Sequence, residues 1–362
     1  MDKSLINRFR EEVNDRDLVL QMYHNHNGKD QWSIICSAMD WIDVVVEEID
    51  VCKLSRGNDN ESSIRLMTFI MCIDVLWEAI QQLSRVFFCA ESIPFSDDNS
   101  IFAHKLFLTT DNAYFKTIRA CFAAHPVNLN DRFGGTKEKE RWYASWSGGK
   151  FGEGDFSAFL YSNKPHERSI LFSVQFNELI AFAQKRYNYL NDLMDEIRRQ
   201  KKNYLEGWRH KEIPRSNDPL AQIEMLVEEA SRRPCSHEYY NYKLKKLQII
   251  FSTTITSPQN KALVERYKNA LKAEIEGIYE NLQNMISDEL RREQSINDSC
   301  PPSCRYYFSK LCEIIYGDEY YPLDYVKCFQ PYLHELAELS EDMPMDELYT
   351  VVCAGFFALN AG

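Results

Sequence analysis

Glycine and proline are scarce in this sequence, with 13 and 12 residues among 362. Folds built from many short strands use both residues in their turns, so this scarcity argues against an all-β protein and favours helices. A disordered chain is also excluded, because hydrophobic residues make up 44% of the sequence and disordered chains contain few of them. At roughly 100–200 residues per domain, the length predicts one large domain or two ordinary ones.

Membrane spans and a secretory signal are missing as well. No window approaches the roughly 18 uncharged apolar residues of a transmembrane helix. The first residues, MDKSLINRFREEVNDRD, are polar and charged, unlike the apolar centre of a signal peptide. The 11 cysteines are an odd number, which disfavours a complete disulfide framework. We therefore expect a cytoplasmic protein with reduced thiols and no contact with a membrane.

Familiar catalytic and cofactor motifs are absent: there is no Walker A motif, no dinucleotide-binding glycine fingerprint, no HExxH and no GxSxG. The segment SCPPSCRYYFSKLC contains Cys300, Cys304 and Cys312, and Cys328 and His334 follow. A zinc site usually begins with Cys-x-x-Cys and closes with a second pair of ligands, whereas these residues are scattered. Packing of the cysteines between helices is favoured, and we predict no metal and no other cofactor.

The net charge of −12 argues against bulk binding of nucleic acid, whose affinity comes largely from neutralised phosphates. The charge is uneven. Residues 1–210 contain 26 Lys and Arg against 30 Asp and Glu, and residues 211–362 contain 16 against 24. The C-terminal part is the more acidic, which suits a solvated helical module. A local basic patch remains compatible with this balance.

Helical periodicity dominates the chain. In QWSIICSAMDWIDVVVEEIDVCKL, apolar residues recur at spacings of three and four, which predicts an amphipathic helix. The segment SSIRLMTFIMCIDVLWEAIQQLSRVFFCA is apolar on most sides, as expected for a helix in the middle of a bundle. The apolar stripe of the first helix consists of Trp32, Ile35, Met39, Ile42, Val46 and Ile49. In the C-terminal part of the chain we predict helices at 218–231, 237–252, 258–295, 304–316, 323–340 and 345–359.

Three short segments between the helices are rich in aromatic and β-favouring residues. Residues 141–147, 156–162 and 168–174 are separated by GGKFGEGD and KPHE, which predicts a three-stranded antiparallel sheet. Trp142 and Trp146 share one face of the first strand. We expect that face to pack against a helix, and a ligand-stacking surface is the alternative.

Together these patterns predict a mainly α protein. A helical bundle would cover residues 1–212, with the β insertion at about 141–175, and an all-helical domain would cover 213–362. The segment EIPRSNDPL, with two prolines in nine residues, is the expected linker. Because this linker is short, one continuous body is the alternative.

The segment IRACFAAHP carries the first candidate site. Arg119 and His125 lie at the predicted end of a short helix whose N-cap would be Asp111. Pro126 disfavours α geometry at His125, so the helix should stop there. The pair resembles the R-x(4–6)-H motif of HEPN domains, small helical bundles found in many prokaryotic RNases, toxins and phage-defence proteins. The resemblance covers about residues 31–125, and Ala120 stands where a polar residue often follows the arginine.

The resemblance implies a metal-independent endoribonuclease in which Arg119 and His125 are catalytic. An acidic residue on the preceding helix often supports the motif, and Asp74 or Glu78 could do so here. It also implies a homodimer, because two motifs meet across the subunit interface in that family. The residue types suit the chemistry: histidine can exchange a proton with an RNA hydroxyl at neutral pH, and arginine can hold two phosphoryl oxygens.

A purely structural role for the pair is the alternative. Arginine in a last helical turn complements the helix dipole, and histidine just beyond it can bond to free carbonyls. Residues six apart in a continuous helix are separated by about 240° around the axis. Arg119 and His125 can therefore act together only if His125 leaves the helix.

A second candidate site is the basic segment RRQKKNYLEGWRHK, residues 198–211, with six Lys and Arg against one Glu. Basic side chains interleaved with aromatic ones suit single-stranded nucleic acid. The alternative is a solvated helix end, where Lys and Arg are expected in any case. The candidate nucleic-acid-binding residues are Arg198, Arg199, Lys201, Lys202, Tyr204, Trp208 and Arg209.

Two functional hypotheses follow from the sequence. The first is a HEPN-like protein that binds or cleaves RNA, as an effector of defence or stress. The second is a non-catalytic helical protein that binds another protein or acts as a scaffold, because the amphipathic helices and the acidic surface serve that role equally well.

Overall fold

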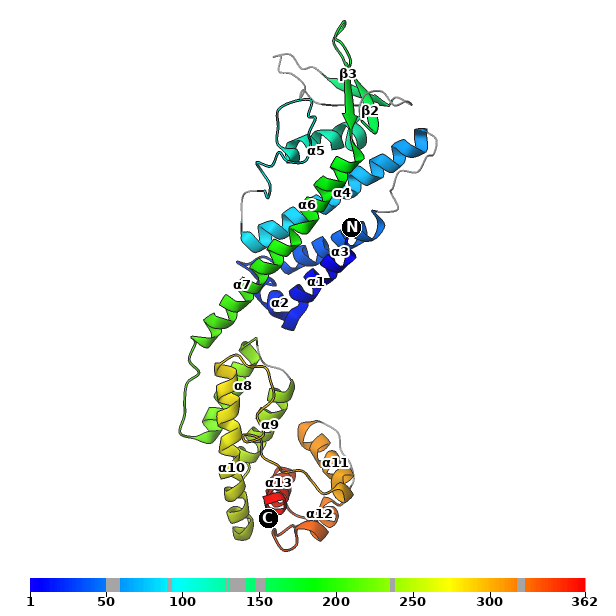
Figure 1. Cartoon of the computed structure of the whole chain (residues 1–362). Helices are drawn as coiled ribbons and strands as arrows, with labels where there is room; N and C mark the ends of the chain where they lie inside the picture. Colours follow the sequence, from blue (N-terminus) through cyan, green and yellow to red (C-terminus); the bar gives the residue numbers. More distant parts are fainter. Residues whose placement is uncertain are drawn as a thin grey trace. The chain divides into compact units, whose positions relative to one another are not determined.

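The computed structural model describes residues 1–49, 59–89, 93–127, 129, 141–146, 154–234, 238–317 and 323–361. The chain divides into two compact units, Met1–Lys202 and Asn203–Gly362, which we call the N-terminal and C-terminal units. In the described residues both units are mainly helical, and one antiparallel sheet of three strands belongs to the N-terminal unit (Figure 1). The predicted fold class is thus confirmed. The division falls inside helix α7 (Leu190–Arg209), whereas the sequence placed a domain boundary after residue 212.

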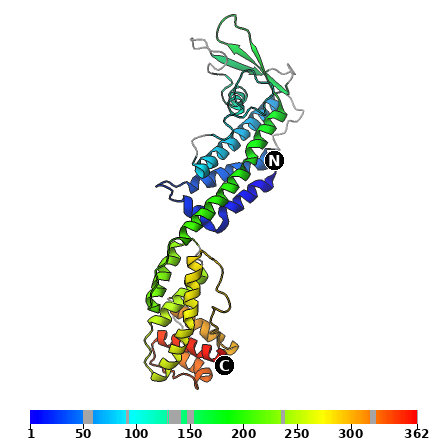
Figure 2. The ribbon, with the colours of Figure 1, turned by 60° about the vertical axis from the view of Figure 1, so that its left-hand side comes forward.

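The N-terminal unit is built on a helical hairpin of α3 (Trp32–Glu48) and α4 (Asp59–Phe88). The predicted stripe of α3 is buried at Ile35, Ile42 and Val46, and α4 is buried on several sides, as expected for a central helix. Figure 1 and Figure 2 show α4 and α6 side by side. The other helices of this bundle are α1 (Lys3–Asn14), the 3-10 turn η1 (Asp15–Asp17), α2 (Leu18–Tyr23), α6 (Phe176–Asn188) and the first part of α7.

Helix α5 (Asp111–Arg119) lies with the sheet at one end of the bundle (Figure 1). Its N-cap is Thr110, whose hydroxyl accepts a backbone hydrogen bond from the first turn. The prediction that Asp111 is the N-cap is therefore wrong. The Asp111 carboxylate is fully buried and turned to other partners, the Ile101 amide at 2.9 Å and Lys105 Nζ at 2.8 Å.

The turn that ends this helix is not α-helical. Residues Ala120–Ala124 form a short π-helix, η2, and His125 follows with φ −140° and ψ 45°. The helix ends at His125, as predicted from Pro126. The π geometry was not predictable from composition, because such turns have no composition of their own and are rare.

The sheet has the order β1-β2-β3, with β1 (Trp142–Trp146), β2 (Phe156–Ser162) and β3 (Ile170–Val174) close to the predicted ranges. Both pairings are antiparallel, and Tyr143 lies opposite Tyr161.

The inner face of the sheet packs on α5 and η2. Phe172 is fully buried, and its ring centroid lies 5.8 Å from that of Tyr114 and 5.2 Å from that of Phe122. Trp142 is buried on this face, in line with the expected packing role. The side chain of Trp146 lies outside the described residues.

A buried arginine holds the loop before α5 in place. Arg186 of α6 is fully buried, donates to Asn112 Oδ1 at 2.7 Å, and places its guanidinium 3.6 Å from the centroid of the Phe182 ring. Asp98 of the loop lies 3.6 Å from Arg186 Nη1. Burial lowers the pKa of Arg186 to about 10, and the guanidinium remains charged at neutral pH. This contact fixes the start of α5 against the bundle.

The C-terminal unit is mainly helical and contains no strand in its described residues. Helix α13 (Met345–Ala361) is buried along most of its length, which marks it as the centre of this core. The helices around it are the end of α7, α8 (Pro219–Arg232), α9 (Glu238–Ser252), α10 (Pro258–Gln283), the 3-10 turn η3 (Pro302–Cys304), α11 (Arg305–Tyr316) and α12 (Tyr325–Leu333).

Two of the predicted helices are too long. The helix predicted at 258–295 ends at Gln283, and Met285 has a positive φ of 58°. The chain then folds back, and Leu290 and Gln294 cover Gly277, where a Cβ would meet them at 2.9 Å. Periodicity alone missed this reversal, because the returning segment is also partly apolar.

The helix predicted at 323–340 covers only Tyr325–Leu333. The segment after it is held as a loop by Asn260, whose side chain donates to the Glu338 carbonyl at 2.7 Å and accepts from the Glu338 amide at 2.9 Å. In the described part of the chain, no helix is both long enough and apolar enough to cross a lipid bilayer.

Candidate functional site

The structure brings Arg119 and Asp74 together. Arg119 is the last residue of α5, and Asp74 lies on the preceding long helix, α4. Arg119 Nη1 lies 2.6 Å from Asp74 Oδ2. The side chain of Arg119 is 36% exposed and that of Asp74 is 22% exposed, so the guanidinium is anchored and still reaches solvent. A guanidinium has five N–H donors. One of them bonds to Asp74, and N–H donors on the exposed part of the group can bond to a ligand.

Glu78, the other acidic candidate, is not part of this contact. It lies one helical turn after Asp74, is exposed, and accepts a hydrogen bond from Gln82 Nε2 at 2.8 Å. Arg85 Nη1 is 4.0 Å from the Glu78 carboxylate. The spacing of four residues made the two acids equivalent in the sequence, and only the position of α5 distinguishes them.

His125 is exposed and stands directly after the π-helical turn. Its amide donates to the Ala120 carbonyl at 3.0 Å. On the other side, the Pro126 carbonyl accepts from the Ala144 amide of β1 at 2.6 Å. The backbone of His125 is therefore held between η2 and the sheet, and its side chain leaves the helix as a joint action with Arg119 requires. No hydrogen bond joins the side chains of Arg119 and His125, both of which are described.

This arrangement has the parts for metal-free phosphoryl chemistry: a half-exposed guanidinium, a carboxylate that orients it and an exposed imidazole nearby in the chain. A guanidinium recognises phosphoryl oxygens in pairs. An imidazole is the side chain best suited to proton transfer at neutral pH.

The N-terminal part of the basic segment is occupied by ion pairs. Arg199 forms two bonds to Glu196, at 2.8 and 2.6 Å, and this pairing lowers the pKa of Glu196. Lys201 is buried, with Nζ 2.7 Å from Glu12 Oε1 and 2.8 Å from Asp15 Oδ2.

Arg198 belongs to the same network, since its Nε lies 2.7 Å from Glu12 and its Nη1 3.0 Å from Asp195. Partial burial opposes ionisation of Glu12, but the bonds from Lys201 and Arg198 outweigh it and lower the pKa of Glu12. These cations are thus engaged in holding α1 against α7. Lys202 is exposed.

The remaining residues of the segment lie in the C-terminal unit. Trp208 is half-buried, with Lys211 Nζ 3.8 Å from the centroid of its ring, and Tyr204 contacts it edge-on at 6.4 Å between centroids. Arg209 bonds to the Asn284 carbonyl at 3.0 Å and pairs with Glu206 at 3.2 Å. The Trp208 ring is thus partly covered from within this unit.

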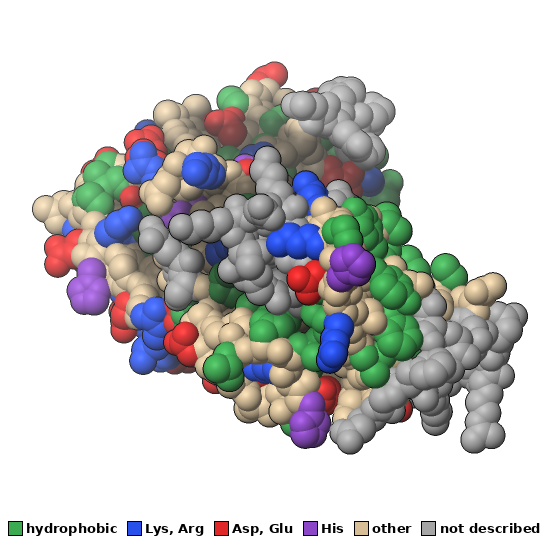
Figure 3. Space-filling view, turned by 90° about the horizontal axis from the view of Figure 1, so that it is seen from above, with side chains coloured by type: hydrophobic (Ala, Val, Ile, Leu, Met, Phe, Trp, Pro, Cys, Tyr) green, Lys and Arg blue, Asp and Glu red, His purple; other side chains and the backbone are tan. Residues whose placement is uncertain are grey.

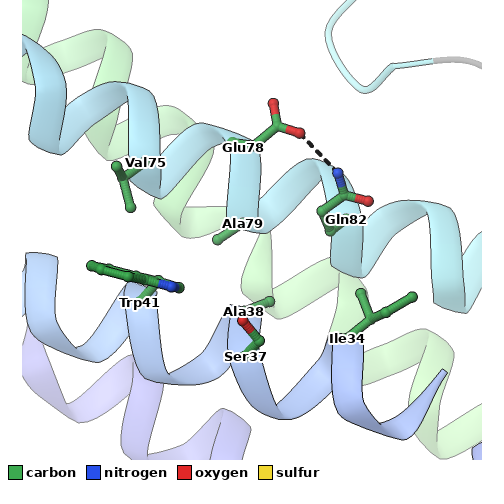
Figure 4. Close-up of a pocket in the computed structure, with 8 residues that line it drawn as sticks. All are labelled: Ile34, Ser37, Ala38, Trp41, Val75, Glu78, Ala79 and Gln82. Atoms are coloured by element: carbon green, nitrogen blue, oxygen red, sulfur yellow. Dashed lines mark hydrogen bonds between the residues drawn. The ribbon is translucent and has the colours of Figure 1, made fainter. Parts of the chain in front are cut away.

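A second feature of the N-terminal unit escaped the sequence analysis. A groove of about 300 Å³ runs between α3 and α4, with Ala38, Val75 and Ala79 in its lining (Figure 4). Trp41 lies across this groove from Val75 and is 55% exposed. The signal was present in the sequence: Ile34, Trp41 and Val44 form an apolar line on α3 beside the buried stripe.

Three polar side chains of the C-terminal unit bond to one another inside its core. Lys246 pairs with Asp298, which also accepts from the Tyr267 hydroxyl at 2.5 Å. Burial raises the pKa of the Cys353 thiol, which keeps it protonated and unreactive. Among the described residues, no three His, Cys, Asp or Glu side chains are grouped so that they could hold a metal ion.

Comparison of the chain with protein-family models, with curated proteins and with solved structures finds no match in any of the three. The geometry of the residues themselves therefore carries the functional argument.

Proposed function

We propose that the N-terminal unit is a HEPN-like, metal-independent endoribonuclease module that acts on RNA in the cytoplasm, with Arg119 and His125 as catalytic residues. The observation that carries this proposal is the 2.6 Å pair between Arg119 and Asp74. It joins the arginine of the motif to an acid on the preceding helix while leaving the guanidinium half-exposed. Asp74 is a positioning residue in this scheme, and Glu78 has no part in it.

The proposed reaction is an attack by the RNA on its own phosphodiester. The His125 imidazole accepts the proton of the 2′-hydroxyl, and O2′ forms a bond to phosphorus. The P–O5′ bond breaks, and the leaving O5′ takes a proton from the second motif of a dimer. Arg119 holds the non-bridging oxygens as negative charge develops on them. The products are a 2′,3′-cyclic phosphate and a free 5′-hydroxyl.

The scheme requires a homodimer, which is also what the resemblance to HEPN domains implies. Light scattering coupled to gel filtration tests this requirement at several protein concentrations. A mass of about twice the 42.5 kDa of one chain is expected wherever cleavage is observed. Full activity of a monomer would show that a second motif is not required for cleavage.

The central test is cleavage of single-stranded RNA in the presence of EDTA. The wild-type chain is compared with His125→Ala and with a matched control, His24→Ala, which removes another exposed histidine of the same unit. We expect EDTA-resistant cleavage that His125→Ala lowers by about 10²–10⁴-fold and His24→Ala leaves unchanged. Equal activity of the two variants, or no cleavage by the wild type, would refute the proposal.

A protein-binding role for the α3–α4 groove is the second candidate. Ile34 and Trp41 line this groove and are 40% and 55% exposed, so it offers apolar surface to a partner. Helices α3 and α4 contain eight Asp and Glu against two Arg, so the occupant that fits is an amphipathic helix with a basic polar face. A second copy of the same face would oppose acid to acid.

Titration with a synthetic Leu- and Lys-rich amphipathic peptide, followed by tryptophan fluorescence, tests this candidate. Saturable binding that Trp41→Ala weakens by about tenfold or more is expected for an aromatic anchor. An acidic amphipathic peptide of equal affinity, or no binding of the basic one, would contradict it.

A further inference from the structure

The outward face of the sheet carries a group of aromatic side chains. Tyr143 of β1 and Tyr161 of β2 lie directly opposite each other and are 40% and 48% exposed. Phe159, two residues from Tyr161 on the same face of β2, stacks on it with 6.3 Å between ring centroids and 26° between planes. Three rings therefore lie side by side on one sheet surface.

These rings are not needed for the core. The inner face of the same strands supplies it, since Leu160 and Phe172 are fully buried and Ala158 is 1% exposed. Cross-strand aromatic pairs stabilise a sheet, yet two tyrosines exposed by 40% or more leave ring faces in contact with water. An aromatic surface of this kind on a small sheet is suited to stacking of a planar ligand.

The aromatic face is joined to the candidate catalytic residues through the backbone. The chain that follows His125 pairs with β1, first through Pro126 and Ala144 and then through two bonds between Leu129 and Trp142, at 2.9 and 3.2 Å. This pairing extends the sheet beyond β1. His125 thus stands one residue before the extension of the sheet that carries Tyr143.

The charge of this part of the chain differs from the rest. Residues 105–175 contain ten Lys and Arg against seven Asp and Glu, a net +3, whereas the net charge is −9 before them and −6 after them. Figure 3 views the molecule from the sheet end of Figure 1 and shows hydrophobic side chains beside Lys, Arg and His. His166 and Arg168, in the turn between β2 and β3, are both exposed. The positive balance of this part of the chain favours an anionic ligand over a neutral one.

From this geometry we infer that the outer face of the sheet binds single-stranded RNA, with bases stacked on Tyr143 and Tyr161. The inference rests on the proposed function and deepens it: the sheet holds the substrate, and the backbone of the RNA runs past β1 toward His125 and Arg119. Aromatic rings stack any unpaired base, and local positive charge attracts the phosphates. Bases inside a duplex are already stacked on each other and offer no free face.

Fluorescence anisotropy with the full-length His125→Ala chain tests the inference without cleavage of the probe. The probes are a fluorescein-labelled single-stranded RNA of mixed sequence and the RNA duplex. We expect Tyr143→Ala and Tyr161→Ala each to weaken single-stranded RNA binding by roughly 5- to 150-fold. Tyr143→Phe and Tyr161→Phe keep the ring and should bind within about twofold of the parent.

The matched control is Tyr306→Ala, which removes a 62% exposed tyrosine of the C-terminal unit and should leave binding unchanged. Circular dichroism confirms that each variant is folded. Binding that is equal for Tyr143→Ala, Tyr161→Ala and the parent would overturn the inference. So would duplex RNA that binds as tightly as single-stranded RNA.

Failure of this inference differs from failure of the proposed function. If the wild type does not cleave RNA but binds it in a way that depends on the two tyrosines, the RNA-binding role of the sheet is supported and the ribonuclease activity is refuted. If His125→Ala abolishes cleavage and the tyrosine variants do not change it, the ribonuclease activity is supported and the RNA-binding role of the sheet is refuted.

Discussion

Two cationic regions of this molecule lie in different environments. At the end of α5, one arginine meets one carboxylate, and its side chain remains 36% exposed. On α7, Arg198, Arg199 and Lys201 are surrounded by four carboxylates, those of Glu12, Asp15, Asp195 and Glu196.

The difference shows that a cluster of Lys and Arg in a sequence does not measure the positive charge offered to a ligand. The richer cluster is neutralised by Glu12 and Asp15, at and just after the end of α1, and by Asp195 and Glu196 of its own helix. Glu12 lies more than 180 residues before Arg198 in the sequence. The single arginine bonds to Asp74 through Nη1 and stays 36% exposed, so its guanidinium keeps donors for a ligand. The predictions below test this contrast.

Among the cations of these two regions, the largest effect on activity is expected at Arg119. Arg119→Ala removes the donors that would stabilise negative charge on the phosphoryl group and should lower kcat by about 10²–10³-fold. Arg119→Lys keeps the charge without the planar fork and should recover only part of the loss. Single-turnover cleavage of RNA measures both. Arg119→Lys with wild-type activity would show that the fork geometry is irrelevant.

A large effect on stability, rather than activity, is expected at Lys201. Lys201→Met keeps the aliphatic chain but leaves Glu12 without its buried partner, and should destabilise the N-terminal unit by about 2 kcal/mol. Lys202→Met changes the exposed neighbour and should cost less than about 0.5 kcal/mol. Urea unfolding followed by circular dichroism measures the free energies. Equal effects of the two variants would deny the structural role of the α7 cluster.

A smaller effect separates the two acids of α4. Asp74→Asn weakens the charged bond that orients Arg119 and should lower kcat by about tenfold with KM nearly constant. Glu78→Gln, which changes an acid bonded only to its own helix, should leave kcat within about twofold. Steady-state kinetics on both variants provide the comparison. A loss at Glu78 equal to that at Asp74 would contradict the assigned geometry.

The smallest effect is expected at Arg199. Because Glu196 already holds its guanidinium by two bonds, Arg199→Ala should change RNA affinity by less than about twofold and leave the salt dependence of binding unchanged. Anisotropy titrations at several salt concentrations measure both quantities. A reduction of the salt slope by about one unit would show that Arg199 contacts a phosphate.

Much of the fold follows from local patterns in the sequence. The spacing of Ile35, Ile42 and Val46 places the buried face of α3, and the richness in aromatic and β-favouring residues places the strands. Pro126 places the end of the helix at His125. These features depend on neighbours in the chain, which periodicity describes well.

The features that the sequence did not predict depend on contacts distant in the chain. Thr110 rather than Asp111 caps α5, because Asp111 is drawn to Lys105 and to the Ile101 amide. Helix α10 ends early because Leu290 folds back over Gly277. The choice of Asp74 over Glu78 depends on where α5 crosses α4.

The exposed aromatic face of the sheet was also not predictable from the sequence. Trp142 and Trp146 are the bulkiest residues of β1, and Trp142 is buried. Tyr143 lies between them and points to the opposite face. Which face of an aromatic strand is open depends on the position of α5 and η2, and composition does not encode that position.

The most direct test of the central claim uses one RNA and the same RNA with a single 2′-deoxynucleotide at the cleaved position, in EDTA. The account predicts that the all-RNA strand yields a 2′,3′-cyclic phosphate, detected by mass spectrometry, and that the substituted strand stays intact at that position. Cleavage of both strands at that position, or of neither, would contradict it.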